Sequence, residues 1–269
     1  MRTIEPTVRL SSMGESPGGW DPAEYGDRIA DVYDDWFDGV DAGLPAAVGM
    51  LAELAGDGPV LELGIGTGRA ALPLAAAGVK VAGVDASERM VARLWSKPGG
   101  ADIPVTIGDF GDPAVLAEAA EPFGGFRVVY VVFNTFFVLT SQVEQVRCFA
   151  AVADALVPGG AFVARAFVPD QGRYTNGSRF HVAGIAGDES RLLASVHDRN
   201  AQTIRTNHLV IGPRGVETYP INIRYAWPAE LDLMAALAGL TLEARHGDWS
   251  GSPFSNTSPD HVSVWRKPA

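Results

Sequence analysis

The chain has one cysteine, Cys148, among its 269 residues. A single thiol cannot form a disulfide within the chain, and such sparing use of cysteine is typical of a reducing compartment such as the cytoplasm. Cys148 lies inside a helical pattern, which indicates a small buried side chain. We therefore expect a cytoplasmic protein without a disulfide framework.

Basic clusters and long apolar runs are also missing. The formal net charge is −11 and lysines and arginines form no run, which argues against nucleic acid as a partner. No stretch reaches the ~20 apolar residues that a membrane helix needs, and the N-terminus is too polar for a signal peptide. The expected partner is therefore neither a nucleic acid nor a membrane.

The composition is that of a globular enzyme, with 47% hydrophobic and 20% charged residues. The length suffices for one domain with a substantial core and an inserted subdomain. Residues 1–19 contain Ser11, Ser12, Pro17 and the pair Gly18-Gly19, and we expect them to form a flexible tail. Residues 20–269 are expected to form a single domain.

A glycine-rich segment is the strongest signal in the chain. The apolar run Val60–Leu63 stops at three glycines spaced two apart, Gly64, Gly66 and Gly68, and a helical pattern follows at once. Glycine lets the backbone turn tightly and approach a ligand, and a helix N-terminus offers unpaired N–H groups. Asp85 ends the next apolar run. The pattern predicts a strand, loop and helix that hold a nucleotide.

This segment alone does not identify the nucleotide. Residues 66–71 also fit the dinucleotide pattern G-x-G-x-x-A, and Asp85 lies at the distance expected for a ribose-binding acid in either case. An NAD(P)-dependent oxidoreductase is therefore an alternative function, and other features of the sequence are needed to distinguish the two.

Two later features of the sequence favour one of these two enzyme classes. The short strand 105–108 ends in Asp109 and Phe110, an acid and an aromatic ring suited to an adenine, and Pro158 opens a Pro-Gly-Gly turn before the strand 161–167. With Glu62, the glycines and Asp85, this order resembles the class I S-adenosylmethionine-dependent methyltransferases over about residues 55–170. The resemblance implies S-adenosyl-L-methionine as the cofactor.

Strand-like and helical segments alternate through this region and predict an α/β fold. The expected segments are 60–63, 69–77, 79–84, 87–95, 105–108, 113–120, 128–132, 142–156 and 161–168. Near-continuous apolar strands in such an alternation predict a parallel sheet with helices on both faces. With the resemblance, this gives a Rossmann-like seven-stranded, mostly parallel sheet whose last strand is antiparallel. Residues 20–56 are expected to form an N-terminal helical cap, and residues 57–170 the cofactor-binding core.

The pattern changes after residue 170. Three strand-like runs, 191–197, 202–211 and 216–225, are joined by short turns and predict an antiparallel β-meander within residues 171–227. The resemblance implies that this insertion is a lid over the substrate. Residues 228–269 are expected to add a helix and a hairpin of strands.

The resemblance assigns residues to the cofactor. Asp85 would bind the ribose, Asp109 the adenine amino group, and Glu62 the glycine loop and the ligand's amino group, while Met90 lies on the adenine or in the core. Tyr25 and Tyr33 either reach the methionine end of the cofactor or pack in the core. The full set is Tyr25, Tyr33, Glu62, Gly64, Gly66, Gly68, Asp85, Ala86, Met90, Asp109, Phe110 and Phe133.

Methyl transfer from a sulfonium is an in-line displacement that needs alignment and exclusion of water. A base is needed where the acceptor is a hydroxyl, and His181 and His197 are the candidates because imidazole titrates near neutral pH. Asn134, a polar residue among apolar ones, is a candidate for holding substrate or cofactor. Each of these residues also has a purely structural interpretation. No His, Cys, Asp and Glu spacing indicates a metal.

The acceptor is less well specified. Residues 132–138 lack the Asn/Asp-Pro-Pro-aromatic signature of nucleic-acid amine methyltransferases, and the chain resembles small-molecule methyltransferases of bacterial secondary metabolism. We expect a neutral or cationic small molecule methylated on oxygen or nitrogen, because Arg173, Arg179 and Arg224 are scattered and could serve one anionic group at most. A C-methyltransferase of an isoprenoid-type scaffold and a non-catalytic S-adenosylmethionine-binding protein are the alternatives. A monomer or homodimer is expected.

Overall fold

The computed structural model describes residues 21–37 and 43–269. The tail predicted for residues 1–19 lies outside these ranges. Within them, no helix is both long enough and apolar enough to cross a bilayer.

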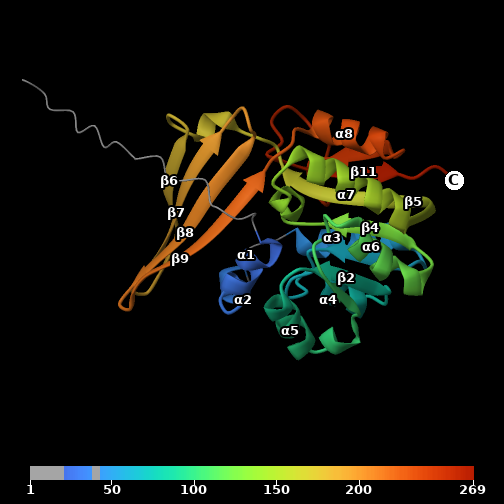
Figure 1. Ribbon diagram of the computed structural model, residues 1–269, viewed down its shortest axis with the longest axis horizontal. Helices are drawn as coiled ribbons and strands as arrows, with labels where there is room; N and C mark the ends of the chain where they lie inside the picture. Colours follow the sequence, from blue (N-terminus) through green and yellow to red (C-terminus); the bar gives the residue numbers. More distant parts are fainter. Residues whose placement is uncertain (1–20, 38–42) are drawn as a thin grey trace, which may run out of the picture.

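A seven-stranded sheet forms the centre of the molecule, in the order β10-β11-β5-β4-β1-β2-β3 (Figure 1). Neighbouring strands from β5 to β3 are parallel, and β11 runs antiparallel to both of its neighbours. The predicted mostly parallel sheet with an antiparallel last strand is confirmed. The strands are β1 Val60–Leu63, β2 Val81–Asp85, β3 Val105–Ile107, β4 Phe126–Val131, β5 Leu156–Phe167, β10 Thr241–His246 and β11 Asp260–Arg266.

Helices cover both faces of this sheet, as expected. On one face α6, α7 and α8 bury a core rich in aromatic rings, in which Phe149 contacts both Phe162 and Trp265. Cys148 lies buried in this core, which agrees with its predicted place. On the other face α3, α4 and α5 enclose a second core. These helices are α3 Leu44–Ala55, α4 Ala71–Ala76, α5 Glu88–Ser96, α6 Pro113–Ala120, α7 Gln142–Ala155 and α8 Pro228–Leu237, and the 3-10 helices are η1 Gly100–Asp102, η2 Glu121–Phe123, η3 Thr135–Val138 and η4 Gln171–Arg173.

Two short helices precede α3, α1 (Pro22–Ile29) and α2 (Tyr33–Phe37), as the helical pattern predicts. Asp21 caps α1 by accepting a hydrogen bond from the backbone N–H of Ala23 at 2.9 Å. Ion pairs join this part of the chain to the core: Asp31 pairs with Arg89 and Arg93, and Asp34 with Lys97. Figure 1 shows α1 and α2 between the two sheets.

The insertion is a second, antiparallel sheet of four strands, which we call the lid sheet: β6 Ser178–Ala186, β7 Glu189–Asp198, β8 Thr203–Gly212 and β9 Gly215–Arg224. The predicted antiparallel meander is confirmed, but the sequence predicts only the last three of its four strands. β6 is hidden in the sequence because Phe180 and Val182 point to solvent, with 65% and 58% exposure, and because its pairing is irregular between Val182 and Gly184.

One face of the lid sheet turns toward the core, and strand pairing groups its residues in rows. His181, Leu193, His208 and Tyr219 form one row across the four strands. The next row is Arg179, Ser195, Thr206 and Ile221, and a third joins His197, Ile204 and Ile223 on β7, β8 and β9. Directly paired residues share a face of a sheet, so these side chains line one surface.

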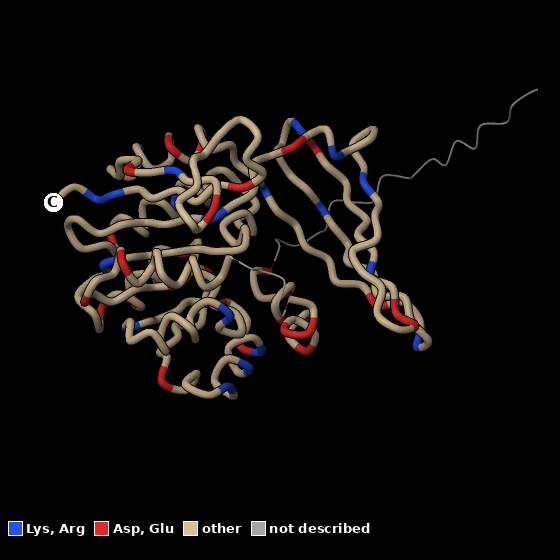
Figure 2. The backbone as a smooth tube through the Cα atoms, turned by 180° about the vertical axis from the view of Figure 1, so that it is seen from behind, with Lys and Arg blue, Asp and Glu red and all other residues tan. Residues whose placement is uncertain are grey.

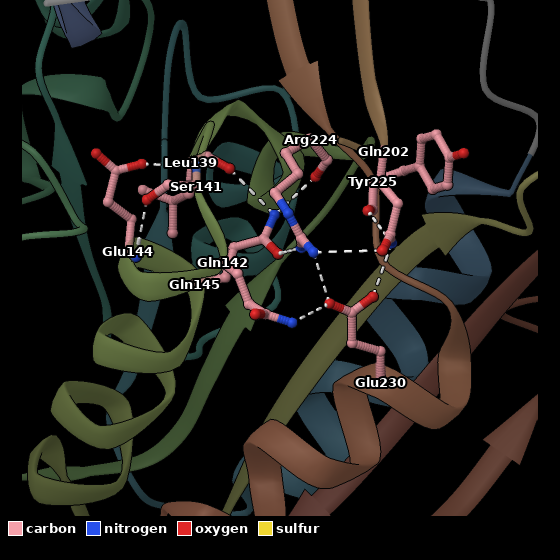
Figure 3. Close-up of polar contacts among 9 residues, drawn as sticks. All are labelled: Leu139, Ser141, Gln142, Glu144, Gln145, Gln202, Arg224, Tyr225 and Glu230. Carbon is pink, nitrogen blue, oxygen red and sulfur yellow. Dashed lines mark hydrogen bonds and ion pairs between the residues drawn. The ribbon is translucent and has the colours of Figure 1, made fainter. Parts of the chain in front are cut away.

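A buried polar network attaches the lid sheet to the core (Figure 3). Arg224, at the end of β9, donates a hydrogen bond to Gln145 Oε1 on α7 at 2.6 Å and pairs with Glu230 on α8 at 2.7 Å. Gln145 in turn donates to the carbonyl oxygens of Leu139 and Arg224. The network therefore fixes the β8–β9 end of the lid against the helices beside the site. Figure 2 shows acidic and basic segments interspersed over the molecule.

Candidate functional site

A cavity of about 670 Å³, the main cavity, lies at the carboxyl ends of the parallel strands and under the lid sheet. Ligands of open α/β sheets bind at this edge. Most of the residues that the sequence singles out for the cofactor line it: Tyr25, Tyr33, Glu62, Gly64, Gly66, Asp85, Ala86, Met90, Asp109, Phe110 and Phe133, together with Asn134. Gly68 is absent from the lining.

The glycines serve two different purposes. Gly64 has φ +69°, and a Cβ there would lie 2.5 Å from Thr135 Cγ2, so the loop cannot carry a side chain beside the cavity. A Cβ at Gly68 would instead lie 2.3 Å from Leu94 Cδ1 on α5. Gly68 therefore allows close packing beneath the loop and does not contact the cavity.

Asp85 orders the loop as well as facing the cavity. Its carboxylate accepts hydrogen bonds from the backbone N–H of Gly66 at 2.7 Å and of Ser87 at 2.9 Å. Ser87 is the N-cap of α5 through its own side chain, which accepts from the N–H of Met90. Burial raises the pKa of Asp85, and the two backbone hydrogen bonds oppose that shift.

Glu62 is a buried acid on the floor of the cavity, with 2% exposure. Its carboxylate accepts a hydrogen bond of 2.9 Å from the hydroxyl of Tyr130, which is fully buried. Burial raises the pKa of Glu62 to about 8, although the Tyr130 hydrogen bond acts in the opposite direction. A buried acid of this kind is a site suited to a ligand cation, because a positive charge favours the ionised carboxylate.

Two aromatic hydroxyls from the N-terminal helices reach the cavity. Tyr25 and Tyr33 both line it, and burial raises the pKa of each phenol. Both therefore stay neutral at physiological pH and can donate hydrogen bonds. They belong to the cavity wall, which supports the cofactor interpretation of these residues over simple core packing.

Phe133 and Asn134 follow β4 in an uncommon backbone conformation. Their φ angles are +56° and +69°, in the left-handed region that residues other than glycine seldom occupy. The Asn134 side-chain oxygen accepts a hydrogen bond of 2.7 Å from the N–H of Phe167 at the end of β5. Such outliers cluster at functional sites. Asn134 thus holds the end of β5 while it lines the cavity.

One cation in the cavity, Arg69, is not among the site residues predicted from the sequence. Arg69 follows Gly68 directly, and its guanidinium lies 3.5 Å from the centre of the Phe133 ring. Its NH1 donates to the carbonyl of Phe37 at 3.1 Å, whereas its buried Nε has no hydrogen-bond partner among the described residues. Arg69 is the charged residue directly after the three glycines, and this position in the sequence could have indicated that it faces the ligand.

The histidine that faces the main cavity is His208, not His181 or His197. His181 and His197 line a neighbouring cavity of about 170 Å³, the second cavity. His208 shares one face of β8 with Thr206, but the opposite face carries the polar residues Arg205 and Asn207, so the sequence could not show which face was inward. Burial lowers the pKa of His208, with help from the charge of Arg191.

The residues of the main cavity fit S-adenosylmethionine. Its sulfonium and amino group are cations, and Glu62 is a buried acid that has no cation within the set of ion pairs formed by the described residues. The carboxylate of S-adenosylmethionine would find a counterion in Arg69, whose Nε has no hydrogen-bond partner among the described residues. Phe110 and Met90 supply apolar surface beside Asp109. In the described part of the chain, no three His, Cys, Asp or Glu side chains are grouped to hold a metal ion.

Comparisons with known proteins agree with this fit. Residues 60–160 match the model of a methyltransferase domain family. The chain is 30% identical over 250 residues to the cypemycin N-terminal methyltransferase of Streptomyces sp, covering 91% of this chain and 98% of that protein.

Solved structures extend the likeness to the whole fold. The CcbJ methyltransferase from Streptomyces caelestis superposes with a TM-score of 0.83 at 39% identity, over 93% of this chain and 100% of that one. CalS10, an amino pentose methyltransferase from Micromonospora echinaspora solved with S-adenosylmethionine bound, shares the fold with a TM-score of 0.63 at 20% identity, over 88% and 97% of the two chains. The dinucleotide-dependent oxidoreductase alternative is thereby set aside. The chain belongs to the class I S-adenosylmethionine-dependent methyltransferases, in the group related to enzymes of natural-product biosynthesis.

Proposed function

We propose that the enzyme transfers the methyl group of S-adenosylmethionine to an amine nitrogen of a small secondary metabolite. The observation that carries this proposal is the place of the His208 imidazole in the lining of the main cavity, where burial lowers its pKa. The name of the relative that is 30% identical, an N-terminal methyltransferase, supports nitrogen over oxygen as the acceptor atom.

His208 is held in place for this role. Its ring stacks on Trp36, with 6.1 Å between ring centres and an interplanar angle of 6°. Of the lid residues that line the main cavity, Leu193, Thr206, Ile221 and Ile223 cannot titrate, which leaves His208 as the group that can exchange a proton there. Because its pKa is lowered, the imidazole is neutral near pH 7 and can accept a proton.

The chain's own residues would then divide the work. Asp85 and Asp109 would bind the ribose and adenine, and Glu62 and Arg69 the two charged groups of the methionine end. When bound, the cofactor supplies a methyl group on a positively charged sulfur. His208 would take the proton that the ammonium form of the acceptor must lose, and the freed nitrogen lone pair would then form the new N–C bond as the C–S bond breaks and its electron pair stays on sulfur. Tyr25, Tyr33 and the lid sheet exclude water.

The test uses pairs of small acceptors that share a skeleton and differ in carrying an amine or a hydroxyl, with products identified by mass spectrometry. We expect methylamines, and a methyl ether from the hydroxyl partner alone would overturn the proposal. His208→Gln should lower kcat and remove the acid limb of the kcat–pH profile while S-adenosylhomocysteine still binds. His246→Gln, on β10, is the matched control and should leave both unchanged.

A further inference from the structure

The second cavity, next to the main cavity, is built differently. It measures about 170 Å³ and lies between the β6–β7 half of the lid sheet and the segment that follows β5. It shares Phe167, Leu193, Thr206 and Ile223 with the main cavity, so the two adjoin along the inner face of the lid. A ligand that fills both would lie across the strands, along the rows that link β9 to β6.

The charges around the second cavity are mostly positive. Arg179 and His181 come from β6, and Arg173 from η4. Arg173 forms an ion pair of 3.4 Å with Asp170, the one acid in the lining, whereas Arg179 forms no ion pair with any described residue. The positive field of Arg179 and Arg173 helps to lower the pKa of His181, after the larger effect of burial. The guanidinium of Arg179, which has no ion pair among the described residues, thus lines a cavity whose one acid, Asp170, is already paired with Arg173.

A second observation concerns His181. Its Nδ1 atom is buried and has no hydrogen-bond partner among the residues that the structure describes. Buried polar atoms are almost always paired, so an exception on a residue that lines a cavity calls for an explanation, and a ligand in that cavity is one. By contrast, the other histidine of this cavity, His197, is already satisfied by a hydrogen bond of 2.9 Å between its Nε2 and the Tyr225 hydroxyl.

We propose that the second cavity is the subsite for a carboxylate group of the acceptor, bound by Arg179 and His181. A guanidinium matches the planar, two-oxygen geometry of a carboxylate, and a neutral imidazole can donate one N–H to it. The remaining walls include Phe167, Ile204 and Ile223, which suit the hydrocarbon part of an organic acid. A phosphate dianion would call for more cations than one unpaired arginine.

This inference rests on the proposed function, because it makes the acceptor zwitterionic: an amine near His208 and a carboxylate near Arg179. It differs from the expectation of a neutral or cationic substrate. That expectation treated Arg173 and Arg179 as scattered, whereas the fold of η4 against β6 brings both to one cavity.

The test measures the subsite without turnover, in protein saturated with S-adenosylhomocysteine. Three probes of one size are titrated and followed by NMR: benzoate, benzamide and phenyl phosphate. We expect benzoate to bind and to shift the ring signals of His181, benzamide to bind at least tenfold more weakly, and phenyl phosphate no better than benzoate. Benzoate that binds no better than benzamide, or phenyl phosphate that binds tighter than benzoate, would overturn the inference.

Variants locate the effect. Arg179→Gln should weaken benzoate binding about tenfold. Arg205→Gln removes the same charge from the outer face of β8 in the same sheet, where Arg205 is exposed, and should change nothing. An equal loss in both variants would mean a general charge effect and would overturn the assignment to Arg179. If Arg179→Gln fails to fold, the assignment is tested by whether benzoate shifts the NMR ring signals of His181 in the wild-type protein. Because no methyl transfer is measured, benzoate binding together with methyl ether products in the acceptor panel would refute the amine proposal alone.

Discussion

The Tyr130 hydroxyl donates a hydrogen bond of 2.9 Å to the Glu62 carboxylate, and both side chains are buried, at 0% and 2% exposure. One donor does not offset the burial of a negative charge, so the pKa of Glu62 rises to about 8. At neutral pH the free protein therefore holds a proton at the centre of a site whose ligand brings positive charge.

This proton predicts a pH-dependent affinity. A ligand cation favours the ionised carboxylate, so binding below pH 8 must release the proton from Glu62. We expect the affinity for S-adenosylhomocysteine to increase as pH rises from about 6 to about 8, with proton release measured by calorimetry in buffers of different ionisation enthalpy. Glu62→Gln should abolish the release, and 5′-methylthioadenosine, which lacks the amino group, should show none. Equal proton release by wild type and Glu62→Gln would place the proton elsewhere.

Asp85 has a dual role, in the loop and at the ribose, and predicts a double loss. Asp85→Ala should weaken S-adenosylmethionine binding by on the order of 1–3 kcal/mol, because ribose hydroxyls lose their acceptor. It should also lower the thermal unfolding temperature, since the N–H groups of Gly66 and Ser87 lose theirs. Asp188→Ala, an exposed acid between β6 and β7, is the control. Normal ligand affinity with a lowered unfolding temperature would show that Asp85 acts only on the loop.

The core of the fold and much of the site could be predicted because they depend on local signals. Apolar strands that end in glycine and acid, at Gly64 and Asp85, report both the strand and the edge at which a ligand binds. The same holds for Pro113, which begins α6 where the sequence places it. These features are set by the backbone within a few residues, so one sequence suffices to find them.

The inward face of the lid sheet and its first strand could not be predicted from the sequence, for a physical reason. The two faces of the lid sheet carry similar mixtures of polar and apolar side chains. The alternation of side chains along β8 therefore does not show that His208 faces the main cavity and Arg205 the solvent. β6 was missed because Phe180 and Val182 lie on the outer face. Arg173 and Arg179 line one cavity because of how the segment after β5 folds beside the lid sheet, which no local pattern reports.

Arg69 predicts a selective loss in cofactor binding. Its unpaired Nε and its position over Phe133 make it the counterion for the methionine carboxylate in our proposal. Arg69→Met keeps the length of the side chain and removes the charge, so S-adenosylhomocysteine should bind about tenfold more weakly. The affinity for 5′-methylthioadenosine, which has no carboxylate, should not change. An equal loss for both ligands would mean that Arg69 only supports the loop and Phe133.

The last prediction concerns the network that holds the lid. Arg224 and Glu230 form an ion pair of 2.7 Å, with side-chain exposures of 8% and 17%. Arg224→Met leaves the buried acid without its cation and Gln145 without its donor, so the free energy of unfolding should fall by about 3 kcal/mol, measured in urea. Removing one member of an exposed pair is the control: Arg28 and Glu24 are 50% and 36% exposed, and Arg28→Met should cost less than about 1 kcal/mol.

The same variant separates stability from substrate binding. Arg224 lines neither cavity, so Arg224→Met should leave S-adenosylhomocysteine affinity within about twofold of wild type. Because β9 and β8 carry Ile223 and His208 over the site, a loosened lid should raise KM for the acceptor more than it lowers kcat. The double variant Arg224→Met with Glu230→Met replaces the pair by apolar side chains and should recover most of the lost stability. If the double variant regains stability but its KM for the acceptor stays high, the geometry of the polar network is what holds the lid in position. A large loss of cofactor affinity in Arg224→Met would instead mean that the network supports the whole cavity and not the lid alone.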